Sequence, residues 1–321
     1  MLKTIEEKVL EGNGITWDEA LNLSKLKGDD IKALLDLANR VREKNAGNRI
    51  DLCSIMAAKV GRCSENCKFC SQSAHHSCNI NVYDLISDAD VSKRIEEIEN
   101  SGAHRFCLVT SGEKLTDKEF ERILKIYDLL NRKTDLSLCA SLGALDANRA
   151  YALKQAGVKM YHHNVETSRS YFSKICTTHT YDDRINTIKA AKKADLKICC
   201  GGIISMGESM VNRLEMAFEI KELDVDSIPI NILTPIKGTP LQDIKLLSHD
   251  EILKSIALFR LIMPHKVIRL AGGKENGLGE DEKKAYIGGI NGALVGNYLT
   301  TSGRRVEDGL NMFRQIGYEI N

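Results

Sequence analysis

The amino-acid sequence predicts an α/β fold, a (β/α)8 TIM-type barrel with an N-terminal helical extension. Two observations predict it. Eight short strand-like runs recur along the chain, and most of them are separated by longer charged stretches with helical spacing. Strands and helices that alternate at this rhythm are typical of parallel βαβ units. Eight such units that close on themselves form a barrel, and a doubly wound open sheet is the alternative.

The chain begins with helical segments, which we assign to residues 1–48. Thr16 and Glu19 have the Thr-x-x-Glu spacing of a capping box, and residues 29–44 repeat apolar side chains at helical spacing. No low-complexity stretch or Pro/Ser-rich linker follows them. We therefore expect two or three helices that pack on the barrel domain, residues 49–321, instead of forming a separate unit.

The barrel elements follow in chain order. We predict strands at residues 53–58, 105–110, 136–141, 158–164, 196–204, 227–233, 266–271 and 292–297, and crossover helices that include residues 117–131, 180–194, 209–223 and 248–263. Three of the four prolines lie within residues 228–240. Because proline cannot donate to a strand ladder, this stretch marks the end of a strand and an irregular loop.

The composition is that of an ordinary soluble globular protein. Lys and Arg number 45 and Asp and Glu number 44, which gives a formal net charge of +1, and 43% of the residues are hydrophobic. A near-neutral chain has no overall field that attracts polyanions, so we expect no nucleic-acid partner. The first residues lack the apolar core of a secretory signal, and no run of about 18 apolar residues occurs. We therefore expect a cytoplasmic protein without a membrane span.

Ten cysteines stand out, a number too small for a disulfide scaffold of this length. Cys63, Cys67 and Cys70 have the spacing C-x3-C-x2-C, in a loop after the first predicted strand, on the face of a barrel where active sites lie. Three thiolates in one loop can hold three irons of a cubane cluster and leave the fourth iron open. The alternative is a zinc knuckle with His75 or His76 as the fourth ligand.

Three further cysteines, Cys107, Cys139 and Cys199, each lie inside a different predicted strand. Every second residue of a barrel strand faces the interior, so these thiols can converge and form a second metal site. The alternative is three unconnected buried cysteines that act as small hydrophobic residues. Cys200 follows Cys199 directly, so we expect it to face the helices.

The first cysteine motif, with the aromatic Phe69 before its last cysteine, resembles that of the radical S-adenosylmethionine (SAM) enzymes. The resemblance implies that Cys63, Cys67 and Cys70 hold a [4Fe-4S] cluster whose open iron is chelated by SAM. One-electron reduction then yields a 5′-deoxyadenosyl radical that abstracts hydrogen from carbon. Phe69 matches an aromatic residue near the adenine.

The strand cysteines narrow the resemblance to the biotin synthase family, over nearly the whole chain. Similar stretches lie at residues 161–168, 199–203, 229–233, 237–240 and 268–273. The resemblance implies a sulfurtransferase that inserts sulfur into dethiobiotin to form biotin. It also implies an auxiliary [2Fe-2S] cluster as the sulfur donor, with Cys107, Cys139, Cys199 and Arg269 as its ligands.

The same resemblance implies roles for four polar residues. Asn164 and Glu166 match positions that contact the adenosyl cofactor, and Asn231 matches a position that hydrogen-bonds the ureido ring of dethiobiotin. Amides offer both a donor and an acceptor to a cyclic urea. His162 stands at another ureido-contacting position, where family members can carry Asn.

The surplus cysteines are Cys53, Cys78, Cys176 and Cys200. Cys53 lies on the first predicted strand, which neighbours the strand of Cys107 in a barrel. We hypothesise that Cys53 adds a fourth thiolate to the auxiliary site and permits a cluster larger than [2Fe-2S]. The sequence assigns no chemistry to the other three.

Further partners follow from the resemblance alone: a one-electron reductant such as flavodoxin or ferredoxin, the iron-sulfur assembly machinery and a second copy in a homodimer. A rival enzyme function is that of a radical SAM mutase or a hydrogenase-maturation protein. The non-enzyme rival is a zinc-binding interaction module.

Overall fold

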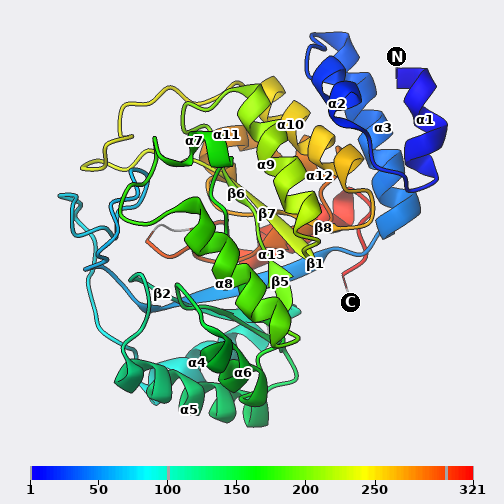
Figure 1. Cartoon of the computed structure of the whole chain (residues 1–321). Helices are drawn as coiled ribbons and strands as arrows, with labels where there is room; N and C mark the ends of the chain where they lie inside the picture. The colour runs from blue at the N-terminus through cyan, green and yellow to red at the C-terminus, as the bar shows by residue number, and fades with distance from the viewer. Residues whose placement is uncertain (1, 100–101, 301–302, 321) are drawn as a thin grey trace.

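The computed structural model describes residues 2–99, 102–300 and 303–320 of the chain. Within these residues, parallel strands form one sheet in the order β5-β4-β3-β2-β1-β9-β8-β7-β6, and β5 also pairs with β7, so that the sheet closes (Figure 1). The strands are β1 (Asp51–Lys59), β2 (Arg105–Thr110), β3 (Ser137–Ser141), β4 (Met160–His162), β5 (Lys197–Cys199), β6 (Gly202–Ile204), β7 (Ser227–Ile232), β8 (Val267–Leu270) and β9 (Gly292–Leu294). The predicted (β/α)8 barrel is therefore confirmed.

The predicted strand at residues 196–204 differs, because it is divided into β5 and β6. The break falls at Gly201, where an added Cβ would lie 1.9 Å from the Pro229 carbonyl oxygen of β7. Close approach of the two backbones interrupts the ladder, since only a residue without a side chain fits there. Both halves pair with β7, so β5 and β6 together occupy one strand position of the barrel.

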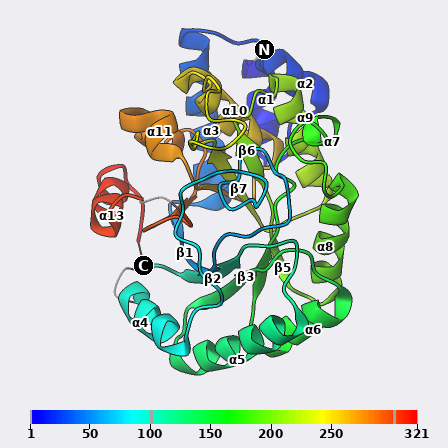
Figure 2. The same cartoon turned by 90° about the vertical axis from the view of Figure 1, so that its left-hand side faces the viewer.

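Helices surround the barrel (Figures 1 and 2). They are α1 (Leu2–Leu10), α2 (Trp17–Leu23), α3 (Asp29–Ala46), α4 (Asp88–Glu99), α5 (Asp117–Lys133), α6 (Ala147–Gln155), α7 (Arg169–Phe172), α8 (Tyr181–Lys193), α9 (Met210–Glu222), α10 (His249–Ile262), α11 (Lys274–Leu278), α12 (Glu282–Tyr286) and α13 (Val306–Gln315). Several begin with a side-chain cap, as at Thr116 of α5 and Thr180 of α8, where the hydroxyl accepts from the backbone three residues on. None of these helices combines the length and the apolar character needed to cross a lipid bilayer.

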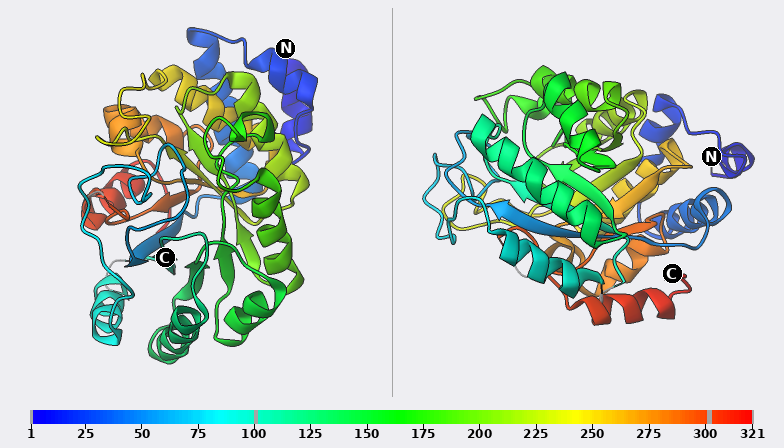
Figure 3. Two further views of the ribbon diagram at one scale, coloured as in Figure 1. Left: turned by 60° about the vertical axis from the view of Figure 1, so that its left-hand side comes forward. Right: turned by 90° about the horizontal axis from the view of Figure 1, so that it is seen from below.

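The N-terminal helices α2 and α3 lie against α9 and α10 on one side of the barrel, and α1 packs on α3 (Figures 1 and 3). The predicted capping box of α2 is present, with reciprocal bonds between Thr16 and Glu19. The Ile15 amide donates to the Leu261 carbonyl at 3.0 Å, which ties the segment between α1 and α2 to the end of α10. The first three helices are therefore packed on the outside of the barrel.

The loops after the strands gather at the carboxyl-terminal end of the barrel. The long loop between β1 and α4 crosses this end in front of β7 (Figure 2). It contacts the β4–α8 segment, where the Lys68 amide donates to the Ile175 carbonyl at 3.0 Å. The first cysteine motif therefore lies over the mouth of the barrel.

Candidate active site

A cavity of about 460 Å³ occupies the barrel interior and opens at the mouth. Most of the site residues that the sequence predicts line it: Cys53, Phe69, Cys107, Cys139, His162, Asn164, Glu166, Cys199, Asn231 and Arg269. Cys63, Cys67 and Cys70 lie in the loop above it. Residues from the first and last thirds of the chain are thus brought to one space by the closed sheet.

The four inner cysteines, Cys53, Cys107, Cys139 and Cys199, form one buried cluster inside the barrel. Cys107 of β2 and Cys139 of β3 are paired neighbours in the sheet. Cys53 of β1 pairs with Arg105, two residues before Cys107, so it lies on the same interior face. The structure thus brings the strand cysteines together and adds Cys53 to them, whereas Cys200 packs in the core between barrel and helices.

Arg269 lies beside the inner cysteines on β8. Its Nη2 donates to the Asp51 carboxylate at 2.5 Å, and its Nη1 donates to the Asp51 and Ala293 carbonyls at 2.9 and 3.0 Å. Arg105 donates through Nε to the other Asp51 oxygen at 2.9 Å. One carboxylate therefore holds two guanidinium groups at the closed end of the cavity.

Arg105 and Asp51 are functional candidates that the sequence reasoning missed. Both stand two residues before an inner cysteine, Arg105 before Cys107 and Asp51 before Cys53. Side chains on alternate strand positions share a face, so this alternation is the signal that identifies them.

The inner cysteines are suited to a multi-metal group. Burial raises the pKa of the Cys53 thiol to about 11, and burial with neighbouring thiols raises the pKa of Cys107 and Cys139 well above the ordinary value. The thiolate forms therefore require positive charge close by, which bound iron supplies. Within the described part of the chain, no three inner Sγ atoms lie all within 4.8 Å of one another. The donor set is thus too wide for a single ion and fits an iron-sulfur cluster.

The loop cysteines are held by the folding of their own loop. The Cys63 amide donates to the Gln72 carbonyl at 3.0 Å, and the Cys70 amide donates to the Cys67 carbonyl at 3.0 Å. Burial raises the pKa of the Cys70 thiol to about 11. Phe69 points to the cavity and packs with a small apolar cluster at its mouth. Three thiols in one loop, whose aromatic residue lines the cavity, fit a cluster that must reach a bound ligand.

His75 and His76, the candidate fourth ligands of a zinc knuckle, both bond to backbone carbonyls. A ring nitrogen of His75 lies 2.9 Å from the Ser64 carbonyl, and Nδ1 of His76 lies 2.9 Å from the Cys70 carbonyl. Among the residues with described positions, neither histidine joins a group of three close ligand atoms. The geometry therefore does not favour the zinc knuckle.

Asn164 and Glu166 follow β4 at the rim of the cavity. Asn164 Oδ1 accepts from the Gly201 amide at 3.1 Å, and its Nδ2 donates to Glu166 at 3.3 Å. Glu166 has a left-handed backbone with a φ of 67°, a conformation that non-glycine residues adopt at a cost. Its carbonyl accepts from the Ile203 amide at 2.8 Å, which fixes that turn.

Arg184 of α8 is a second residue that the sequence reasoning missed. Its Nη1 donates to the Asn164 carbonyl at 2.9 Å and lies 3.5 Å from the Glu166 carboxylate. Its buried Nε has no hydrogen-bond partner among the described residues, and the side chain lines the cavity. A buried guanidinium with an unpaired donor is suited to an anionic group of a bound ligand.

Asn231 and His162 lie deeper in the cavity. Asn231 Oδ1 accepts from the Gly272 amide at 2.9 Å, and its Nδ2 donates to the Gly202 carbonyl at 3.2 Å. His162 Nδ1 lies 3.2 Å from the Cys199 Sγ, so this imidazole contacts an inner cysteine. Burial lowers the pKa of His162 to about 4, which keeps the ring neutral at physiological pH.

Comparison with known proteins gives consistent matches. The Radical SAM superfamily matches residues 59–220, and the Biotin and Thiamin Synthesis associated domain matches residues 229–319. The chain is 56% identical over 319 residues to the biotin synthase of Acetivibrio thermocellus, covering 99% of each. It is 50% identical over 318 residues to that of Clostridium tetani, covering 99% of this chain and 98% of the relative.

Two solved structures share the fold. The crystal structure of methylornithine synthase has a TM-score of 0.87 at 20% identity and covers 99% of this chain and 97% of its own. A maturase of the [FeFe]-hydrogenase has a TM-score of 0.84 at 18% identity and covers 98% of this chain and 74% of its own. At these identities the likeness describes the barrel and not its reaction.

Proposed function

Since the chain belongs to the biotin synthase family of the radical SAM superfamily, we propose that it converts dethiobiotin to biotin, with the barrel cavity as the place of sulfur insertion. The observation that carries the proposal is two separate cysteine sets at one cavity: the inner set lines it, and the loop set lies in the segment whose Glu65 and Phe69 line it. When bound, the [4Fe-4S] cluster with SAM supplies one-electron hydrogen abstraction from carbon, and the auxiliary iron-sulfur cluster supplies sulfur.

At the mouth, Cys63, Cys67 and Cys70 hold the [4Fe-4S] cluster. Phe69 packs on the adenine of SAM, and Asn164 and Glu166 bind its adenosyl part. The Asn164 and Glu166 side chains are hydrogen-bonded to each other, so they meet the cofactor as a fixed pair. Arg184 supports both residues and offers its unpaired Nε to the cofactor carboxylate.

At the closed end, Cys107, Cys139, Cys199 and Arg269 hold the auxiliary cluster. The Asp51 carboxylate beside Arg269 raises the pKa of this guanidinium against the opposing effect of burial. Arg269 is therefore fixed in position by Asp51 and two carbonyls, and one of its nitrogens would have to lose a proton to bind iron. Cys53 lies among the same thiols, which supports the hypothesis that it adds a ligand and permits a cluster larger than [2Fe-2S].

Between the two cysteine sets, Asn231 and His162 bind the ureido ring of dethiobiotin. A neutral imidazole offers one donor and one acceptor, as the amide of Asn231 does. The apolar walls contributed by residues such as Ile55, Val109 and Leu294 exclude water from the carbon chain of the substrate. Exclusion of water limits side reactions of a radical.

The assay that tests this function is anaerobic and contains dethiobiotin, SAM and a reductant, with biotin and deoxyadenosine measured together. Cys67→Ser removes a cofactor-cluster ligand, so we expect loss of both products. Cys139→Ser leaves the mouth intact, so deoxyadenosine should persist while biotin is lost. Cys78→Ser, at a half-buried cysteine with no proposed role, is the matched control and should keep both products.

Equal loss of the two products in Cys67→Ser and Cys139→Ser would contradict this division of roles. Deoxyadenosine without biotin in the unaltered chain would favour the mutase or hydrogenase-maturation alternative instead.

The remaining partners belong to the same proposal. A one-electron reductant of the flavodoxin or ferredoxin class, the iron-sulfur assembly machinery, a homodimer and a cytoplasmic location are supported by family membership. The division into a helical extension, residues 1–48, and a barrel domain, residues 49–321, is supported by the packing of α2 and α3 against α9 and α10 and of α1 on α3. Sedimentation of the purified chain tests the dimer.

A further inference from the structure

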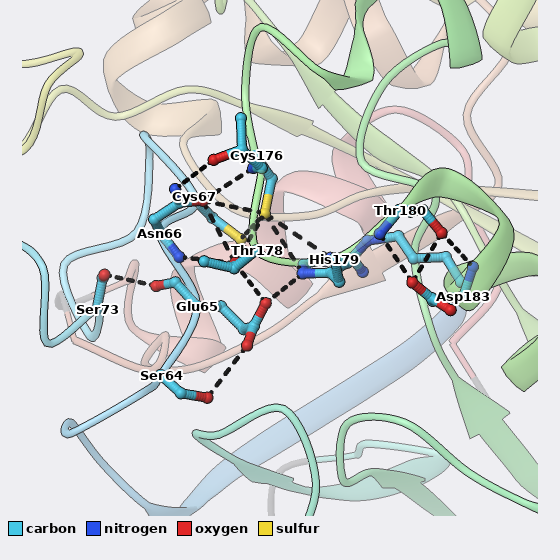
Figure 4. Close-up of polar contacts among 12 residues, drawn as sticks. Ser64, Glu65, Asn66, Cys67, Ser73, Cys176, Thr178, His179, Thr180 and Asp183 are labelled. Atoms are coloured by element: carbon cyan, nitrogen blue, oxygen red, sulfur yellow. Dashed lines mark hydrogen bonds and ion pairs between the residues drawn. The ribbon is translucent and has the colours of Figure 1, made fainter.

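A second group of potential metal ligands lies beside the mouth of the barrel, where the loop after β1 meets the loop after α7 (Figure 4). The Cys67 Sγ is 3.6 Å from the Cys176 Sγ, and the Cys176 Sγ is 3.3 Å from the His179 Nδ1. The ligand atoms of these three residues all lie within 4.8 Å of one another. Cys176 and His179 have the spacing C-x2-H in a single loop.

The two loops are joined by bonds that do not involve the thiols. The Asn66 amide donates to the Thr178 hydroxyl at 3.1 Å, and Asn66 Nδ2 donates to the Thr177 hydroxyl at 2.7 Å. The Thr178 hydroxyl in turn donates to the Glu65 carboxylate at 2.5 Å. The approach of Cys67 to Cys176 is therefore part of the fold and is in place before any ion arrives.

The separations are close to those expected around one tetrahedral ion. Bonds of about 2.3 Å to sulfur and about 2.05 Å to nitrogen place two sulfur ligands about 3.8 Å apart, and sulfur and nitrogen about 3.5 Å apart. The observed distance of 3.6 Å between the two Sγ atoms lies close to the first value. The His179 Nε2, the ring nitrogen not bonded to Glu65, lies 4.0 Å from the Cys176 Sγ, slightly beyond the second. Thiolate and imidazole together suit zinc, iron(II) and cobalt(II).

The Glu65 carboxylate strengthens this assignment. It is hydrogen-bonded to the His179 Nδ1, and both side chains are largely buried, with exposed fractions of 11% and 13%. A carboxylate that holds one ring nitrogen of a histidine commonly orients the imidazole so that the other nitrogen binds the metal. Since Glu65 holds Nδ1, the nitrogen left for the ion is the His179 Nε2, which lies 4.0 Å from the Cys176 Sγ. Here it also adds negative charge next to two thiols that lose protons when they bind a cation.

We propose that the cluster-free chain binds a single divalent transition-metal ion between Cys67, Cys176 and His179, with the fourth coordination position left to water. Nothing in the proposed reaction uses Cys176 or His179. In one respect the inference rests on the proposed function, because Cys67 also belongs to the [4Fe-4S] set. The ion and the complete cluster therefore compete for one thiolate, and an ion such as zinc delays cluster uptake.

Cobalt(II) titration of the full-length, cluster-free chain tests the site, because tetrahedral thiolate-bound cobalt has characteristic visible and charge-transfer bands. All variants carry Cys53→Ala, Cys107→Ala, Cys139→Ala and Cys199→Ala, so that the inner cysteines add no signal. Cys176→Ser and His179→Ala should each weaken cobalt binding at least about tenfold and change the bands. Cys63→Ser, outside the group, should leave the spectrum and affinity unchanged.

The opposite pattern would overturn the proposal: a spectrum lost in Cys63→Ser and retained in Cys176→Ser places the ion on the loop motif alone. A chain that binds no cobalt overturns it as well. Circular dichroism of each variant shows whether the fold is kept, and His179→Ala gives a reading that does not depend on a changed thiol.

A separate experiment measures the competition between the divalent ion and the [4Fe-4S] cluster for Cys67. Zinc added before anaerobic cluster reconstitution should slow [4Fe-4S] uptake in the unaltered chain, and this effect should disappear in Cys176→Ser, which keeps the cluster ligands. Equal slowing in both chains contradicts the shared thiolate. If neither chain ever takes up a cluster, the proposed function fails while the cobalt result stands, so the two failures are distinguishable.

Discussion

Cys53 and Cys200 are both buried thiols, yet they lie on opposite sides of the barrel wall. Cys53 joins the inner cysteines, and Cys200 packs with the apolar side chains between barrel and helices. Burial raises the pKa of both thiols, so neither is ionised without a metal. The two thiols differ in their neighbours, because Cys53 lies among other cysteines and Cys200 lies among apolar side chains. Substitutions at these two positions therefore form a matched pair.

We predict that Cys53→Ala lowers the iron content of the auxiliary site, because a thiolate that lies among three others is available to a further iron. The measurement is iron and acid-labile sulfide per chain, in a background where Cys63, Cys67 and Cys70 are replaced so that only the auxiliary site counts. Cys200→Ala is the control and should leave the count unchanged. A [2Fe-2S] stoichiometry that is the same with and without Cys53 would exclude the larger cluster.

At the residue scale, the sequence predicts what depends on local spacing. The loop motif is visible in one short stretch, and strand alternation is enough to turn Cys107 and Cys139 inward. The proximity of Cys176 to Cys67 could not be predicted, because it depends on where two loops more than one hundred residues apart cross. Arg105 and Asp51 could have been found from the same alternation that identifies the cysteines.

Among the elements, the fifth strand position shows where sequence patterning stops being sufficient. Residues 196–204 form an apolar run that favours one continuous strand, and β5 and β6 do occupy its two ends. The break at Gly201 is imposed by the backbone of β7, a neighbour that is distant in sequence. Local strand propensity therefore predicts the strand, but the contact that divides it exists only in the closed sheet.

We predict that Gly201→Ala destabilises the fold by about 1–3 kcal/mol, because its Cβ would overlap the Pro229 carbonyl. Urea unfolding followed by circular dichroism measures the free energy of unfolding. Gly309→Ala is the matched control: in α13 its Cβ would meet no atom closer than 4.0 Å, and alanine favours the helix by about 0.5–1 kcal/mol. If both substitutions change stability alike, the close approach does not limit residue 201.

Across the whole molecule, the proposed auxiliary ligands come from β1, β2, β3, β5 and β8, which lie on different sides of the cavity. A group bound by side chains from separate strands joins parts of the barrel that are otherwise linked through backbone hydrogen bonds and packing. Anything that binds the folded chain and not the unfolded one adds to stability.

We therefore predict that removal of iron with a chelator lowers the melting temperature by several degrees, measured anaerobically by circular dichroism. The chain with Cys107→Ala and Cys139→Ala should lose most of this difference, because its auxiliary site no longer forms. A melting temperature that is independent of iron in the unaltered chain would mean that the cluster contributes nothing to holding the strands together.

The Asp51 carboxylate at the closed end of the cavity serves both Arg269 and Arg105. One negative and two positive charges leave an excess of one positive charge there. A positive surrounding stabilises whichever redox state carries more negative charge, and iron-sulfur reduction potentials depend on such charge and hydrogen bonding. This end of the barrel is thus an electron-attracting environment, in which a bound cluster is reduced at a higher potential than in a neutral cavity.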